Sequence, residues 1–253
     1  MKKQLALLVA AASLWLFAVS APLAQNITEW SSETRTILAF KVNPAAVRAL
    51  LPAGWESVPS TAPTSSGANL NVTMMERGVV LDPQGKPLRT GTSRYVVLGV
   101  PARNAQTGQS NTLIVSGISP EGAGAYGVYL TASTAKLERT IAGDADSQGH
   151  VTEAWDFAAA SGERIELRLS FRRGPVAKSH ADSVVRSGIR PEFQRTYHID
   201  QAVDVVRGVG VPDRVEQLSF KASGAKLAAL FDGTETLLSV SAVPFYVREI
   251  SIP

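Results

Sequence analysis

A hairpin pattern between residues 151 and 172 constrains the fold of this chain more than any other feature of its sequence. The second arm, residues 164–172, alternates charged or polar side chains with four apolar ones, namely Ile165, Leu167, Leu169 and Phe171. A period of two is that of a strand with one face against a core and the other in water. The residues Ala-Ser-Gly-Glu at 160–163 form a turn that separates this arm from an earlier one at 151–158. The pattern predicts a sheet with one solvated face.

Strand-like segments recur along the rest of the chain, whereas helical segments are few and short. Predicted strands cover residues 35–42, 70–75, 95–100, 112–118, 126–130, 195–199, 215–220 and 237–250. One helix is predicted over 43–51, with Asn43 as N-cap and Pro44 at its first position. A second is predicted from Ser133 or Thr134 to Ile141. The tally predicts a mainly β (α+β) fold, a curled or closed antiparallel sheet with a few short peripheral helices.

The first 24 residues have the composition of a secretory signal peptide. Lys2 and Lys3 are followed by an apolar run at 5–17 and by small residues at 18–25. We therefore expect an exported protein, periplasmic or secreted. The alternative is an uncleaved anchor, in which case this segment is the protein's contact with the membrane. Residues 25–34 are expected as a polar lead-in, and 35–253 as a single domain, because no linker or repeat divides them.

Charge and cysteine content exclude several classes of function. The chain has 25 Lys and Arg against 22 Asp and Glu, so that without Lys2 and Lys3 the balance is 23 to 22. That balance is not the footprint of a nucleic-acid-binding protein. The absence of cysteine excludes disulfides, thiolate metal sites, a cysteine nucleophile and a lipoprotein anchor.

Neither a cofactor nor a metal is expected from the motifs. Residues 122–127, GAGAYG, match the spacing of a dinucleotide-binding fingerprint, but they precede a predicted strand and not a helix. The three histidines, His150, His180 and His198, are far apart and lack the spacing of metal ligands. A small-molecule ligand remains the expected partner.

Residues 40–55, FKVNPAAVRALLPAGW, resemble the opening of the acetoacetate decarboxylase superfamily, in which a strand enters a short helix that ends in a Leu-Pro or Val-Pro step. The order of the later elements is also similar to that family: residues 127–130 followed by the second helix, the hairpin at 151–173, and Leu-Phe-Asp at 230–232 before a last long strand. The resemblance extends over roughly residues 35–250. It implies an acetoacetate decarboxylase-like β-barrel.

The family's reaction, as the resemblance implies it, is decarboxylation of a small keto acid through an imine on a lysine in an apolar cavity. Such an amine needs a lowered pKa, which burial and a neighbouring cation provide. The family's Pro-Lys-Lys step would fall at residues 144–150, which read DADSQGH. The remaining candidate for a catalytic lysine is Lys136, which we expect within the second helix and exposed.

Four further residues are candidates for a ligand site, although a glutamate at a strand end and a histidine in a loop are more often solvated. Arg35 lies within two positions of the family's carboxylate-binding arginine, and Asn71 stands where an acidic partner is expected. Glu76, at the end of a predicted strand, is a candidate for the barrel mouth. His150 falls where the active-site loop of the family meets its next strand.

Three functions follow from these observations. The first is an exported barrel that lacks the recognisable Schiff-base lysine motif and binds a small ligand, such as a carboxylate or keto acid, in its cavity. The second is an active carbon–carbon lyase, decarboxylase-like, that uses Lys136 or another cavity group. The third is a secreted interaction module whose barrel interior is filled by side chains. The oligomeric state is left open.

Overall fold

The computed structural model describes residues 26–145 and 149–253, so the predicted signal segment lies outside the described residues. Of the helices in these ranges, none combines the length and hydropathy that crossing a bilayer requires. The strands are β1 (Asn26–Lys41), β2 (Trp55–Ser57), β3 (Leu70–Leu81), β4 (Ser93–Asn104), β5 (Ser110–Ser119), β6 (Tyr129–Ala142), β7 (His150–Ala159), β8 (Arg164–Arg172), β9 (Ala177–Ser187), β10 (Gln194–Arg207), β11 (Val215–Ser223) and β12 (Thr236–Ile252). The helices are α1 (Pro44–Leu50) and the 3₁₀ turn η1 (Pro63–Ser65).

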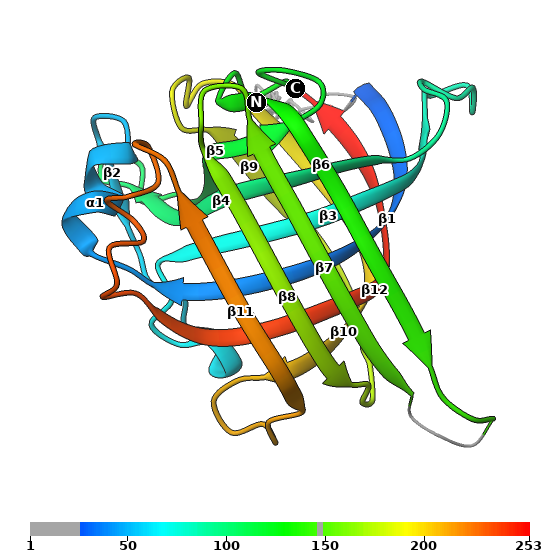
Figure 1. The fold of residues 1–253 in the computed structure, drawn as a ribbon. Coiled ribbons are helices and arrows are strands. Elements are labelled where there is room, and N and C mark those ends of the chain that lie inside the picture. The colour runs from blue at the N-terminus through cyan, green and yellow to red at the C-terminus, as the bar shows by residue number, and fades with distance from the viewer. Residues whose placement is uncertain (1–25, 146–148) are drawn as a thin grey trace, which may run out of the picture.

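Seven of the described strands close into a barrel (Figure 1). Strand β1 pairs with β3 on one side and β12 on the other, and the ring continues through β4, β5, β9 and β10 back to β12. All of these pairings are antiparallel except the short β5–β9 contact. Closure leaves every barrel strand with at least two partners and therefore removes free edges from this part of the sheet.

A second, antiparallel layer of β6, β7, β8 and β11 covers one side of the barrel. Its strands run steeply across β3, β1 and β12 in Figure 1. It is joined to the barrel through the parallel pairing of β5 with the first residues of β6. Alternate residues of β7 and β8, among them Trp155, Phe157 and Leu167, are fully buried against the barrel wall. The period of two in the hairpin therefore reflects a strand pair packed on one face only.

Side chains of each barrel strand on this side alternate between two environments. On β1, Leu38 and Phe40 face the outer layer and join its apolar core. Arg35 and Ile37 face the barrel interior. A smaller apolar cluster, which includes Met75, Tyr95 and Ile114, lies on the interior side. The wall of the barrel thus separates an apolar core outside it from a mixed polar and apolar interior.

Most predicted elements are present, and the fold class predicted from the sequence is confirmed. The hairpin arms are β7 and β8, and helix α1 begins as expected, with the Asn43 side chain accepting from the Ala45 N–H. Strand β9 was not predicted, because its first six residues are all exposed and polar or small, and so lack apolar alternation.

The predicted second helix is wrong, because residues 129–142 form the single strand β6. The spacing of Leu137 and Ile141 fits one helical turn, but it also fits one face of a strand, and pairing with β7 along its length favours the strand. The predicted lead-in is also wrong in part: β1 begins at Asn26. Its polar residues lack the apolar alternation of a predicted strand. Two of them, Glu29 and Glu33, are accommodated in β1 through ion pairs with buried arginines.

Candidate functional site

The barrel interior contains a partly open cavity of about 400 Å³. Each of the seven barrel strands contributes to the lining. Examples are Arg35 of β1, Arg77 of β3, Tyr95 of β4, Ile114 of β5, Val185 of β9, Arg195 of β10 and Arg248 of β12. All five tyrosines of the chain line it: Tyr95, Tyr126, Tyr129, Tyr197 and Tyr246. Four arginines and two glutamates share this lining with the tyrosines and with apolar side chains, so the interior offers more charged groups than most ligand cavities do.

Glu33 is the centre of an ion-pair cluster on one side of the cavity. Its fully buried carboxylate accepts from Arg35 through Nε at 2.8 Å and Nη2 at 2.6 Å, and it lies 2.8 Å from Arg248 Nη2 and 3.5 Å from Arg77 Nε. Burial by itself raises the pKa of Glu33, but the charges of Arg248, Arg35 and Arg77 outweigh burial and hold the pKa at about 2. Glu33 is therefore ionised at any physiological pH.

Two irregularities in the pairing of β1 flank Glu33, whose carboxylate contacts the arginines. The register of β1 with β3 shifts between Ser32 and Glu33, and its register with β12 shifts between Glu33 and Arg35. Bulges of this kind bend a strand and redirect its side chains. A second carboxylate joins the cluster here, because Glu29 pairs with Arg77 and lies 3.8 Å from Arg248. Three guanidinium groups thus share two carboxylates.

Arg195, on β10, is the cavity arginine without a carboxylate partner. Among the described residues it forms no ion pair, and its buried Nε has no hydrogen-bond partner. Its guanidinium carbon lies 5.9 Å from the centre of the Tyr126 ring. A half-buried guanidinium without a counter-charge costs free energy, and a bound anion that pairs with it offsets this cost.

The tyrosines form a hydrogen-bonding wall next to these cations. The hydroxyls of Tyr126 and Tyr197 are hydrogen-bonded to each other. Burial, reinforced by the neighbouring Tyr197, raises the pKa of Tyr126 well above its ordinary value, and burial also raises the pKa of Tyr129 and Tyr246. These phenols remain neutral and can donate to an anionic ligand. Tyr246 also lies under Arg35, with 3.4 Å between guanidinium carbon and ring centre.

A partly exposed ion pair borders the cavity. Glu121, which lines it, pairs with Arg89. The Tyr95 hydroxyl accepts from Arg89 Nη2 at 3.1 Å and from Arg77 Nη1 at 3.4 Å. This pair is neutral as a whole and adds no net charge to the interior.

Two of the predicted site residues line the cavity and three lie elsewhere. Arg35 and Asn71 line it. Glu76 points out of the barrel wall toward the outer layer, where it pairs with Arg94 at 2.5 Å and Arg139 at 3.3 Å. His150 lies on β7, with its Nδ1 3.1 Å from a Glu216 carboxylate oxygen.

Lys136 is exposed on β6, where it pairs in register with Asp156 of β7. The other lysines of the described residues, Lys41, Lys86, Lys178, Lys221 and Lys226, are also exposed, and none lines the cavity. Of the loop at 144–150, where the resemblance places the catalytic lysine, residues 146–148 lie outside the described residues.

Sequence reasoning missed most of the polar residues of this interior. Glu33, Arg77, Arg195 and Arg248 were not singled out, and neither were the tyrosines. One sequence pattern could have identified four of them. Two predicted strands each contain an arginine and a tyrosine two positions apart: Arg195 and Tyr197 in one, Tyr246 and Arg248 in the other. Such spacing places both on one face, which for a barrel is the interior.

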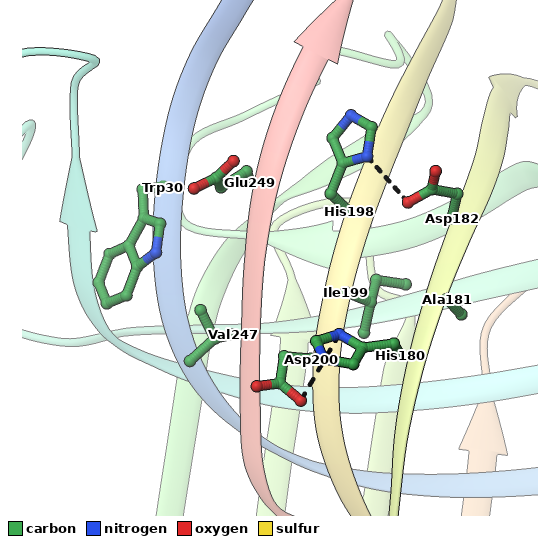
Figure 2. A pocket seen from close by; sticks show the side chains of 9 residues that line it. All are labelled: Trp30, His180, Ala181, Asp182, His198, Ile199, Asp200, Val247 and Glu249. Carbon is green, nitrogen blue, oxygen red and sulfur yellow. Dashed lines mark hydrogen bonds and ion pairs between the residues drawn. The ribbon is translucent and has the colours of Figure 1, made fainter.

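A shallower recess lies on the outer wall of the barrel, across β9, β10, β12 and β1 (Figure 2). His198 Nδ1 lies 2.8 Å from Asp182 Oδ1, and His180 Nδ1 lies 3.9 Å from Asp200 Oδ1. Within residues 26–145 and 149–253, no group of three or more His, Cys, Asp or Glu side chains is arranged to hold a metal ion. The recess faces away from the tyrosine-lined cavity.

Solved structures share this architecture over nearly the whole chain. MppR, an enduracididine biosynthesis enzyme described as complexed with pyruvate, is 14% identical, with 92% of this chain and 91% of that chain covered at a TM-score of 0.57. An acetoacetate decarboxylase-like enzyme from Sphingomonas wittichii is 10% identical, with 96% and 98% covered at a TM-score of 0.53. Acetoacetate decarboxylase from Legionella pneumophila is 12% identical, with 97% and 98% covered at 0.52.

At these identities the likeness concerns the fold. No protein-family model matches the sequence, and no curated protein matches it. The resemblance noted in the sequence is confirmed to that extent: the chain has an acetoacetate decarboxylase-like fold.

Proposed function

We propose that this protein binds a small carboxylate, of the 2-oxo acid type, reversibly and without a covalent bond in the cavity of its acetoacetate decarboxylase-like barrel. The observation that carries the proposal is Arg195, a cavity guanidinium with no carboxylate partner among the described residues and with a buried, unbonded Nε. A carboxylate accepts two parallel hydrogen bonds from such a group. The neutral tyrosines beside it supply further donors.

The absence of lysine from the described lining supports the non-covalent part of the proposal. An imine requires an amine in contact with the ligand, and the described lysines all lie in solvent. MppR, which has the same fold, is described as complexed with pyruvate. A 2-oxo acid is therefore the first ligand to test here.

The two other candidate functions have less support. A lyase that uses Lys136 requires this exposed residue of the outer layer to reach a cavity that it does not line. An interaction module with a filled barrel is inconsistent with an interior cavity of about 400 Å³. Carboxylate binding uses both the cavity and its unpaired cation.

Titration calorimetry with pyruvate and 2-oxobutyrate tests binding, and borohydride treatment followed by intact-mass measurement tests the bond. We expect saturable heat and an unchanged mass. The variant Lys136→Ala is the matched control and should bind as the parent does. A reduced adduct on any lysine would overturn the non-covalent mechanism. Failure of every carboxylate tested to bind would overturn the function itself.

We further propose that the protein acts outside the cytoplasm, as its first 24 residues indicate. Expression of the full chain, followed by mass measurement of the product in the periplasm or medium, tests this. The expected product lacks the initiating segment, with its new N-terminus between residues 19 and 26. A full-length protein retained in the cytoplasm would contradict export.

A further inference from the structure

The distribution of charge in the barrel points to a more specific ligand: we propose that the cavity selects a dicarboxylate, with one carboxylate at each of two separate cationic poles. The inference rests on the proposed function, since it concerns the same cavity, and it adds the ligand class. The first pole is the cluster of Arg35, Arg77 and Arg248, and the second is Arg195.

The first pole retains one positive charge after its internal pairing. Its three guanidinium groups are matched by two carboxylates, those of Glu33 and Glu29. Glu33 remains ionised because its pKa is held at about 2. One positive charge is therefore left for a ligand at this pole.

The second pole carries one positive charge with no internal pairing. Arg195 has no described carboxylate partner. The ion pair of Arg89 and Glu121 at the border of the cavity cancels itself. The interior thus has an excess of two positive charges, one at each pole.

The Tyr126–Tyr197 pair contacts both poles through its rings. The Arg248 guanidinium carbon is 4.5 Å from the centre of the Tyr197 ring, and that of Arg195 is 5.9 Å from the centre of the Tyr126 ring. The two hydroxyls are bonded to each other. A ligand whose acidic groups are separated by a short chain can reach both poles while its middle lies along these phenols.

Charge matching then discriminates between ligands. A monocarboxylate leaves one guanidinium without a counter-charge in a partly desolvated interior, which is unfavourable. A phosphate ester concentrates both charges at one end and leaves the opposite pole empty. A compact dicarboxylate neutralises both poles, and it is the ligand class that the two-pole arrangement fits.

Calorimetry with 2-oxoglutarate and 2-oxovalerate tests the proposal, because both have five carbons and a 2-oxo acid group but only the first has a second carboxylate. We expect 2-oxoglutarate to bind roughly tenfold to a hundredfold more tightly, the range of one charge-assisted hydrogen-bonded pair. Equal affinities, or tighter binding of 2-oxovalerate, would overturn the dicarboxylate proposal and leave carboxylate binding intact. If neither binds, the proposed function fails as well.

A variant tests whether Arg195 itself, and not the general positive charge of the protein, causes the preference for the dicarboxylate. Arg195→Gln should remove most of the preference for 2-oxoglutarate and leave 2-oxovalerate binding less affected. Arg172→Gln, on the exposed face of β8, is the matched control and should keep the preference. Persistence of the full preference in folded Arg195→Gln would overturn the role of the second pole. If that variant does not fold, the comparison of the two ligands on the parent protein still decides the proposal.

Discussion

The carboxylate of Glu33 and the guanidinium of Arg248 lie 2.8 Å apart inside the barrel, although they come from opposite ends of the chain. The contact follows from the antiparallel pairing of β1 with β12, which closes the ring. It joins the last strand of the fold to a cluster that includes Arg35 and Arg77. The three arginines of this cluster, which link β1 to β3 and β12, also line the cavity.

Replacement of Glu33 by Gln should strongly destabilise the protein. It removes the charged acceptor of three buried or half-buried guanidinium groups, and loss of one partner from a buried ion pair typically costs about 3–5 kcal/mol. Urea denaturation followed by tryptophan fluorescence measures the change in the free energy of unfolding. Glu138→Gln, at an exposed position of β6, is the control and should change it by less than about 0.5 kcal/mol. A similar small effect at Glu33 would contradict a stabilising cluster.

The same carboxylate predicts a pH dependence of stability. The pKa of Glu33 is lowered from 4.5 to about 2 on folding. A group with a depressed folded-state pKa contributes stability above its unfolded pKa and loses that contribution as pH falls through the folded pKa. We expect the free energy of unfolding to decrease between about pH 5 and pH 2.

Other carboxylates titrate in this range, so the informative measurement is the difference between the parent and Glu33→Gln. The parent should lose more stability than the variant as pH falls through this window. Parallel curves for the two proteins would show that Glu33 has the same pKa folded and unfolded. Denaturation at closely spaced pH values, in one salt concentration, provides both curves.

Glu153 should stabilise the contact between barrel and outer layer without affecting the cavity. Its buried carboxylate accepts from Thr36 Oγ1 at 2.5 Å, Arg139 Nε at 2.8 Å and Trp155 Nε1 at 2.9 Å. Glu153→Gln weakens these bonds on the outer face of β1, and we expect a loss of about 2–3 kcal/mol. Carboxylate affinity, measured by calorimetry below the unfolding temperature, should change little. A loss of affinity equal to that of Arg195→Gln would show that the two faces of β1 are coupled.

Gly124 should be required for the position of the Tyr129 ring. It has φ +61°, and a Cβ there would lie 2.5 Å from a ring carbon of Tyr129. Gly124→Ala combines an unfavourable backbone conformation, about 1 kcal/mol, with a steric clash at the cavity wall, and should lower both stability and ligand affinity. Gly85→Ala is the matched control, because Gly85 has φ +78° but no atom within 4 Å of its Cβ position. Equal losses of stability and affinity in both variants would show that the backbone conformation alone causes them, and not a clash with the Tyr129 ring.

Local patterns predicted the parts of this fold that are held by local interactions. The alternation at residues 164–172 identified β8, and Asn43 with Pro44 identified the start of α1. Strand β6 was missed because a spacing of four residues between Leu137 and Ile141 fits both a helix and a strand. The neighbouring strand β7, and not the sequence of β6, decides between them.

The sequence by itself determined that the chain is mainly β, that one hairpin has a solvated face, and that residues 144–150 contain no lysine. Arg35 and Asn71 could be assigned to the cavity because a family resemblance placed them. Only the tertiary structure decided that Arg248 and Glu33 meet, that Arg195 has no described carboxylate partner, and that Lys136 lies in solvent. The physical reason is barrel closure: it brings together strands that are distant in sequence, so that the partners of the cavity's charged groups lie on other strands of the ring and not nearby along the chain.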